Sequence, residues 1–112
     1  MLDITKEFRK GILFVRLKGV LNKETVSYLN KEVTKLVADM EIHNVLFNLN
    51  EVTYIDIDGV NAIIYNYNLC KENNGISLLC GVNQSIKNII NRNLSFIFQI
   101  KDEMKAINMV EI

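Results

Sequence analysis

Short apolar stretches alternate with amphipathic helical patterns along nearly the whole chain, and this alternation limits the fold more than any other feature. Residues 12–18 are rich in β-branched and aromatic side chains, 43–50 place apolar residues on both sides of an extended chain, and 76–80 are continuously apolar. Between these stretches, apolar residues recur at steps of three and four over 26–40 and 60–67. Strands alternating with helices predict an α/β domain with a mostly parallel sheet.

The start of the chain adds an antiparallel strand to this sheet. A weaker extended stretch at 4–8 precedes a short turn at 9–11 and the strand 12–18, which together predict a β-hairpin. Gly19 is expected to end the second strand, and Asn22 is expected to cap the helix that follows. The sheet is therefore mixed.

The second half of the chain continues the alternation. Ser85 or Asn83 is expected to cap a helix that carries Ile86, Ile89 and Ile90. A last strand at 96–100 and a terminal helix capped by Asp102 complete the order ββαβαβαβα. We expect a single domain over residues 1–112, with helices flanking the sheet.

Composition excludes several functional classes. The 112 residues include 13 basic and 13 acidic side chains, a formal charge of +0, so no basic field is available to hold nucleic acid. The first six residues lack the layout of a signal peptide, and no apolar run approaches the roughly 20 residues of a membrane helix. We expect a cytoplasmic protein that binds neither nucleic acid nor membrane.

The metal-binding and redox residue types are few. Cys70, Cys80 and the lone His43 do not form a zinc pattern, and the cysteines form no Cys-x-x-Cys pair. We interpret both cysteines as reduced core residues and His43 as a polar residue at the entry to a strand. No cofactor and no metal are expected.

The richest chemistry lies at Asp56-Ile57-Asp58-Gly59-Val60, where a helix is expected to begin. The positive end of a helix favours both carboxylates, so one Asp can be a helix cap and the other a solvated acid of the first turn. An alternative is enzymatic, because the segment resembles the first motif of haloacid-dehalogenase-type Mg²⁺ phosphatases. That resemblance implies Asp56 as nucleophile and Asp58 as acid/base, with Ser77, Lys87 and Asp102-Glu103 completing the site.

The whole chain, however, resembles the STAS domain, the family of sulphate-transporter and anti-sigma-factor-antagonist domains. The turn at 19–22 with Thr25 is similar to the family's Gly-x-Leu-Asp turn, with Asn22 in place of Asp. Residues 45–50 and then 52–56 are similar to its central strand and the approach to its regulatory site, and 56–60 fall on its Asp-Ser-Ser-Gly-Leu motif. Asn74-Gly75 and Asn93-Leu94, each before an apolar strand, continue the similarity.

This resemblance implies a non-enzymatic regulator that binds an anti-sigma factor or related serine kinase. In the family the first serine of the motif is phosphorylated, and phosphate breaks the complex. Ile57 occupies that position and has no hydroxyl, while Asp58 stands at the second serine. The implied partner surface is Asp56, Ile57, Asp58, Gly59, Val60 and Asn61, beside Asn22 and Thr25, with Tyr65 and Asn68 on the outward face of the same helix.

Three functional hypotheses therefore stand. The first is a monomeric or weakly dimeric antagonist that binds its partner without the phosphate switch. The second is the small Mg²⁺ phosphatase that uses Asp56 and Asp58. The third is a scaffold subunit of a larger STAS assembly that has lost regulation. Divalent-metal-dependent turnover separates the second from the others, and size-exclusion of the isolated chain separates the third.

Overall fold

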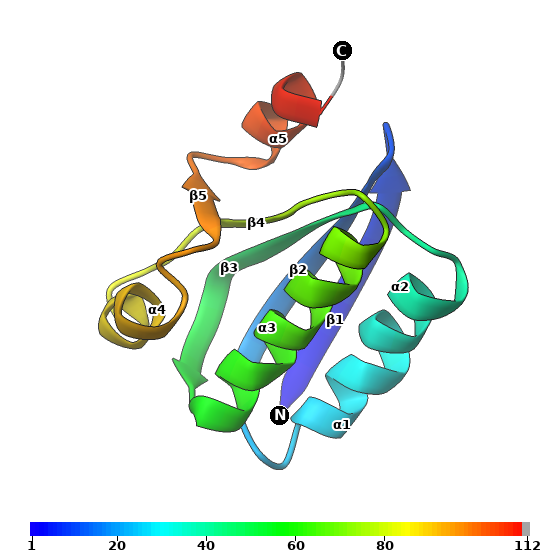
Figure 1. The fold of residues 1–112 in the computed structure, drawn as a ribbon. Helices are drawn as coiled ribbons and strands as arrows, with labels where there is room; N and C mark the ends of the chain where they lie inside the picture. The colour runs from blue at the N-terminus through cyan, green and yellow to red at the C-terminus, as the bar shows by residue number, and fades with distance from the viewer. Residues whose placement is uncertain (111–112) are drawn as a thin grey trace.

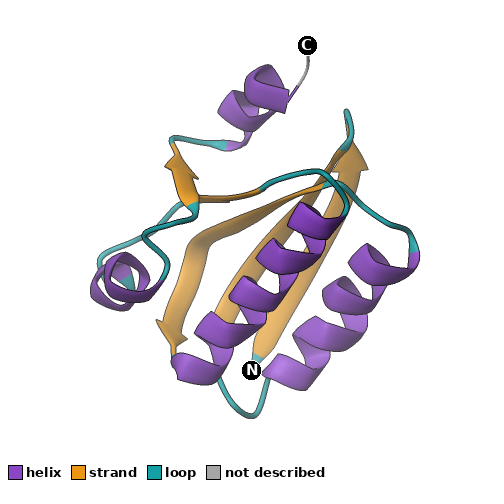
Figure 2. Cartoon of the chain, viewed as in Figure 1, coloured by secondary structure: helices purple, strands orange, loops and turns teal. Residues whose placement is uncertain are grey.

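The computed structural model describes residues 1–110, which form a five-stranded mixed sheet with helices on both faces (Figures 1 and 2). The strands lie in chain order; β1 and β2 are antiparallel, and the β2–β3, β3–β4 and β4–β5 pairs are parallel. The predicted α/β class, mixed sheet and order of elements are confirmed. The elements are β1 (Leu2–Arg9), β2 (Ile12–Leu21), α1 (Val26–Leu29), η1 (Asn30–Thr34), α2 (Lys35–Asp39), β3 (Asn44–Ile55), α3 (Ile57–Glu72), β4 (Ser77–Cys80), α4 (Lys87–Asn93), β5 (Phe98–Ile100) and α5 (Glu103–Val110).

The hairpin of β1 and β2 turns at Lys10 and Gly11, whose φ values of 56° and 80° suit a tight hairpin turn. The prediction that Gly19 ends β2 is wrong, because the strand continues to Leu21. A Cβ at Gly19 would lie 2.2 Å from the carbonyl oxygen of Met1. Glycine there lets the two backbones approach closely while β2 goes on.

The central strand β3 is apolar on both faces, as predicted. Val45, Phe47 and Leu49 belong to the larger apolar core, and Leu46 belongs to a smaller core on the opposite face. The larger core lies under the α1–α2 helix, α3 and α4. The smaller core lies under α5, which adds Ala106 and Ile107 to it.

The third strand is longer than the extended stretch predicted at 43–50. β3 runs on to Ile55, where it pairs with Leu21 of β2. Thr53 and Tyr54, which are β-branched and aromatic, suit this extension, and the extended β2 supplies the hydrogen-bonding partner. The two strands therefore end side by side, directly before residues 56–60.

The first helix is continuous from Val26 to Asp39 but contains one wider π-helical stretch, η1. Its buried face carries Leu29, Val33 and Val37 at the predicted spacing. In Figure 1 this helix and α3 lie next to each other in front of the sheet. They form the wall that borders the candidate site.

The last third of the chain differs in detail from the prediction. Neither Ser85 nor Asn83 caps α4, which starts after Ile86 without a side-chain cap. The Asn83 side chain instead donates to the Val52 carbonyl at 2.8 Å and so fixes the loop to β3. Asp102 does cap α5, since its Oδ1 accepts from the Lys105 N–H at 3.0 Å.

The two cysteines are free and buried, as predicted. Burial raises the pKa of Cys70, and burial also raises the pKa of Cys80 to about 11, so both thiols stay protonated and unreactive near neutral pH. His43 directly precedes β3, and its Nδ1 contacts the carbonyl of Asn73. No helix within residues 1–110 is long and apolar enough to cross a membrane.

Candidate functional site

Asp56 joins the end of the sheet to the start of α3. Its N–H donates to the Leu21 carbonyl at 3.2 Å, which continues the pairing of β2 and β3. One carboxylate oxygen accepts from the Gly59 N–H at 3.0 Å and caps α3, and the other accepts from the Lys23 N–H at 3.0 Å. A single side chain thus holds α3, β3 and the turn after β2 together.

The turn at residues 22–25 lies beside Asp56, as the resemblance implies. Asn22 Oδ1 accepts from the N–H groups of Glu24 and Thr25 at 3.0 and 3.2 Å. Thr25 Oγ1 accepts from the Asn22 N–H at 2.9 Å and donates to the Val20 carbonyl at 2.9 Å. This reciprocal pattern resembles a capping box within the turn, but α1 begins after Thr25 without a side-chain cap, so the prediction that Asn22 caps the helix is wrong.

Gly59 and Val60 face inward. A Cβ at Gly59 would lie 2.6 Å from the Leu21 carbonyl oxygen and 2.8 Å from Ile55 Cγ1, so only glycine lets α3 approach the strand ends this closely. Val60 is buried in the larger core. Both residues therefore pack beneath the exposed start of α3 and fix its position against the sheet.

The exposed part of the segment is Ile57 and Asp58. Ile57 is 55% exposed at the first position of α3, so it does not fill the core. Asn61, Tyr65 and Asn68 continue outward along α3 at steps of four and three, and all three are exposed. The structure thus assembles a surface of one apolar residue, one carboxylate and a polar stripe.

A groove runs beside this surface between the first helix and α3. Its lining residues are Val26, Asn30, Thr34, Asp58, Asn61, Ala62 and Tyr65. Asn66 of α3 is fully buried and bonds to two residues that line the groove. Its amide donates to Thr34 Oγ1 at 3.0 Å and to the Ala62 carbonyl at 2.9 Å.

Sequence reasoning missed the part that Asn30 and Thr34 play in this groove. Both lie within η1, and Thr34 donates to Asn30 Oδ1 at 3.1 Å. The available signal was two polar residues four apart, next to the apolar stripe of the first helix. The π-helical turn itself could not be predicted from the sequence, although such turns are frequent at functional sites.

Two residues that the phosphatase hypothesis requires, Ser77 and Glu103, are not brought to Asp56. Ser77 is buried at the start of β4 and pairs with Val45 at the opposite end of β3 from Asp56, some ten strand residues or roughly 33 Å away. Glu103 lies on the α5 face of the sheet, where Arg16 binds it through two hydrogen bonds of 2.8 and 2.7 Å.

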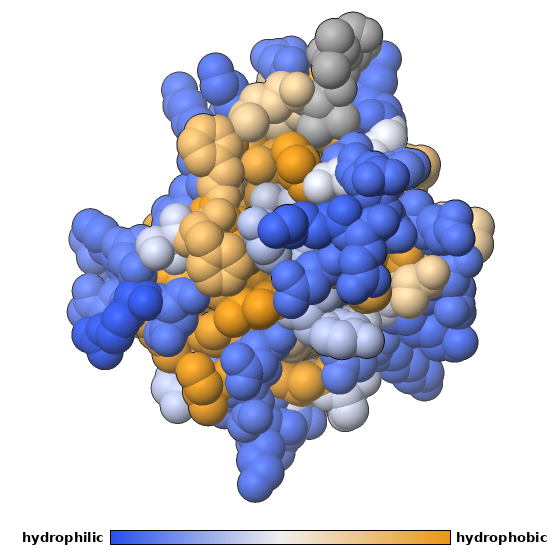
Figure 3. All heavy atoms as spheres, in the orientation of Figure 1, coloured by the Kyte–Doolittle hydropathy of each residue, from blue (hydrophilic) through white to orange (hydrophobic). Residues whose placement is uncertain are grey.

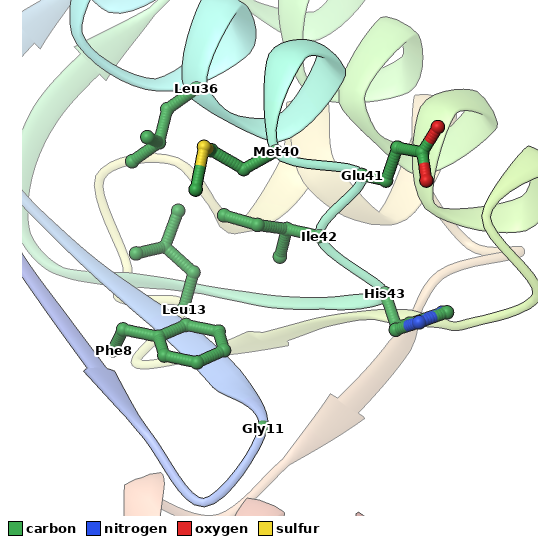
Figure 4. A pocket seen from close by; sticks show the side chains of 8 residues that line it. All are labelled: Phe8, Gly11, Leu13, Leu36, Met40, Glu41, Ile42 and His43. Carbon is green, nitrogen blue, oxygen red and sulfur yellow. The ribbon is translucent and has the colours of Figure 1, made fainter.

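A second hollow lies at the other end of the sheet and contains no residue of the motif. Figure 4 shows Leu13, Leu36, Met40 and Ile42 converging above the ring of Phe8. The rim residues Glu41 and His43 point away from this apolar centre, and the remaining lining residue is Gly11. The hollow offers apolar contact without the acidic and amide groups of the α3 surface.

Comparison with known proteins identifies the family. The STAS domain model matches residues 3–107. The chain belongs to the STAS domain family. An anti-sigma F factor antagonist from Paenibacillus polymyxa is 24% identical over 115 residues, covering 99% of this chain and 97% of the relative. The resemblance seen in the sequence is confirmed, and the chain is an anti-sigma-factor-antagonist-like STAS domain.

Solved structures of the family share its fold. An anti-sigma factor antagonist from Mycobacterium paratuberculosis has a TM-score of 0.86 at 15% identity and covers 100% of this chain and 96% of its own. The phosphorylated form of SpoIIAA from Bacillus has a TM-score of 0.75 at 14% identity, with 96% and 99% covered. These likenesses establish the architecture of the STAS domain.

Proposed function

We propose that this STAS domain is a non-enzymatic antagonist that binds an anti-sigma factor or a related serine kinase through Ile57, Asp58 and Asn61, beside the turn at 22–25. The observation that carries the proposal is the exposure of Ile57 at the position of the family's phosphorylatable serine. The name of the Paenibacillus relative supports the class of partner. We also propose that the domain acts in the cytoplasm.

Ile57 is suited to contact rather than to switching. Asp56 caps the helix directly before it and holds its backbone in place, so little conformational freedom is lost on binding. Burying the exposed half of an Ile side chain contributes on the order of 1 kcal/mol. Because Ile has no hydroxyl, a kinase partner has nothing to phosphorylate at this position.

Asp58 does not replace the missing phosphate. It is one residue further along α3, and adjacent helical positions point in different directions. A phosphoserine carries about −1.5 to −2 charge and three acceptor oxygens, more than one carboxylate supplies. Asp58 instead gives the surface a permanent negative charge, which attracts a partner with basic residues.

Calorimetry with the purified anti-sigma kinase of the same organism tests this proposal. We expect Ile57→Glu to weaken binding by about tenfold or more, since it removes apolar contact and adds charge at the interface. Met40→Glu is the matched control, because Met40 is equally apolar and exposed but lies in the hollow at the other end of the sheet. Equal losses in both variants would contradict the proposed surface.

Incubation with the kinase and ATP tests the missing switch. We expect the intact mass of the wild-type chain to stay unchanged, and Ile57→Ser to gain one phosphate and then lose affinity. Thr53, Ser27 and Ser85 are exposed hydroxyls, and tandem mass spectrometry distinguishes them. Stoichiometric phosphate at Thr53 with release of the partner would show that the switch has moved, and the proposed loss of regulation would be wrong.

A further inference from the structure

The outer edge of β5 is the least protected part of the sheet. β5 pairs with β4 on one side only, and within residues 1–110 no strand pairs with its other side. Its three residues Phe98, Gln99 and Ile100 include no charged side chain. Unpaired backbone donors and acceptors on such an edge are satisfied by another extended strand.

The opposite edge, β1, is protected by charge. Asp3, Lys6, Glu7 and Arg9 all lie on β1, and the Lys6 ammonium group is bound to Glu32 of the first helix at 3.1 Å. Charged edge residues disfavour strand addition because pairing would desolvate them. The difference between the two edges indicates that only β5 is suited to accept a strand.

Exposed apolar side chains surround the β5 edge. Phe98 is 61% exposed and Phe96 is 51% exposed, and together with Ile76, Met109 and Tyr67 they line one continuous hollow. Figure 3 shows hydrophobic residues gathered on this side of the molecule, beside β5 and between α3, α4 and α5. At these exposures the patch amounts to roughly 400 Å² of apolar surface, which is as large as the biggest patch of a typical monomer.

The register of β5 makes it complementary to itself. Phe98 pairs with Leu78 and Ile100 with Cys80, and both partners belong to the core under α5, so Phe98 and Ile100 share that face. In an antiparallel pair of β5 strands centred on Gln99, Phe98 of each copy lies opposite Ile100 of the other copy, so the contact contains two such pairs. Apolar cross-strand pairs of this kind stabilise a sheet.

Gln99 lies on the other face of β5 and sits on the symmetry axis of such a pair. Its side chain donates to Asn91 Oδ1 at 3.1 Å within the chain, beside α4. Each amide also has an acceptor oxygen that can face the partner's amide group. Two-fold symmetry therefore leaves no charge buried at the centre of the contact.

We propose that two copies of this chain associate through antiparallel β5 edges, forming a symmetric dimer with a continuous ten-stranded sheet. The two-fold, self-complementary arrangement is the commonest for homo-oligomers. An apolar patch of roughly 400 Å² supplies about half of the ~800 Å² per partner in a standard interface, and the paired strands and polar rim supply the remainder. This proposal does not depend on the proposed partner surface at the start of α3.

Sedimentation equilibrium of the full chain, from micromolar to millimolar concentration, tests the dimer. We expect a concentration-dependent dimer for the wild type, and a dissociation constant raised at least about tenfold by Phe98→Glu. Phe8→Glu is the matched control, because Phe8 is 62% exposed on a strand but lies far from β5 on the other edge. A wild type that stays monomeric throughout, or equal effects of both variants, would overturn the proposal.

Disulfide cross-linking tests the register separately. Directly opposite residues of an antiparallel pair have Cβ atoms about 4.5–5.5 Å apart, so two copies of Gln99→Cys are expected to cross-link under mild oxidation. Thr5→Cys, in the middle of the exposed β1 edge, is expected to form no disulfide cross-link. Cys70 and Cys80 are buried and do not contribute. Cross-linking of Thr5→Cys but not of Gln99→Cys would contradict the β5 contact even if a dimer forms.

Discussion

Asp56 shows how much of the candidate site depends on one side chain. The sequence predicts that one of the two carboxylates of the segment caps a helix and the other is solvated, and the structure assigns the cap to Asp56 and leaves Asp58 exposed. The second contact of Asp56, with the Lys23 N–H, was not predictable. It requires β2 to continue past Gly19, and the strand signal in the sequence stops there.

The two carboxylates are therefore expected to differ in their effect on stability. Asp56→Ala removes two hydrogen bonds to backbone N–H groups and should lower the free energy of unfolding by about 1–2 kcal/mol. Asp58→Ala removes only an exposed first-turn acid, worth about 0.3–1 kcal/mol. Urea denaturation of both variants measures the difference. Equal losses would mean that the contacts of Asp56 add nothing to the fold.

The same geometry predicts no phosphatase activity. Asp56 is held as a helix cap by one N–H group at each carboxylate oxygen, and Ser77 and Glu103, which the enzymatic hypothesis requires beside it, lie elsewhere. We expect no Mg²⁺-dependent hydrolysis of a generic phosphate ester by the wild type, and none by Asp56→Asn. Turnover in the wild type that disappears in Asp56→Asn would restore the enzymatic hypothesis.

At the scale of elements, α5 is held to the sheet by charge as well as by apolar contact. Arg16 binds Glu103 through two hydrogen bonds and Glu7 through a third at 2.8 Å, and Asn48 donates to Glu103 at 2.9 Å. The hydrogen bond from Arg16 keeps the pKa of Glu103 below its ordinary value near 4.5. A folded-state pKa below the unfolded value adds stability above the unfolded pKa, and this stability is lost as pH falls through the folded pKa.

Glu103→Gln is accordingly expected to lower the free energy of unfolding at pH 7 by about 1–2 kcal/mol. The difference from the wild type should shrink as pH falls below about 4.5, because the unfolded wild-type carboxylate then gains a proton, and it should vanish below the lowered pKa of folded Glu103. The exposed pair of Lys35 and Asp39 is the control, and Asp39→Asn should cost less than about 0.5 kcal/mol. Denaturant titrations across this pH range measure both. A constant difference down to pH 3 would contradict the role of Glu103 ionisation.

The sequence predicts the kind and order of these elements better than their ends. Short apolar or β-branched stretches identify the strands, and apolar steps of three and four identify the long helices, because burial on one or both faces imposes these patterns. The ends depend on contacts distant in sequence. Residues 52–55 are a strand only because β2 reaches Leu21, and β5 begins at Phe98, not at the predicted Phe96, because Phe96 packs edge-on against Tyr67 of α3 with ring centres 5.0 Å apart.

At the scale of the whole molecule, α3 separates the two proposed surfaces. Asp58 lies in its first turn, whereas Tyr67 and Lys71, near its end, line the hollow beside β5. The nine to thirteen residues of helix that separate Asp58 from Tyr67 and Lys71 span about 14–20 Å, beyond the distance at which substitutions usually couple. Neither surface follows from local sequence pattern alone, since each is assembled from segments that only the sheet brings together.

The two surfaces are thus expected to respond to different substitutions. Asp58→Lys places a cation at the positive end of α3 and reverses the charge of the partner surface, so it should weaken partner binding about tenfold and leave the dimer intact. Phe98→Glu should weaken the dimer and leave partner binding unchanged, and the double variant should show both losses. Calorimetry with the partner and sedimentation of each variant provide the comparison. If Phe98→Glu weakens partner binding as much as Asp58→Lys does, the dimer itself is the form that binds, and the two surfaces act together.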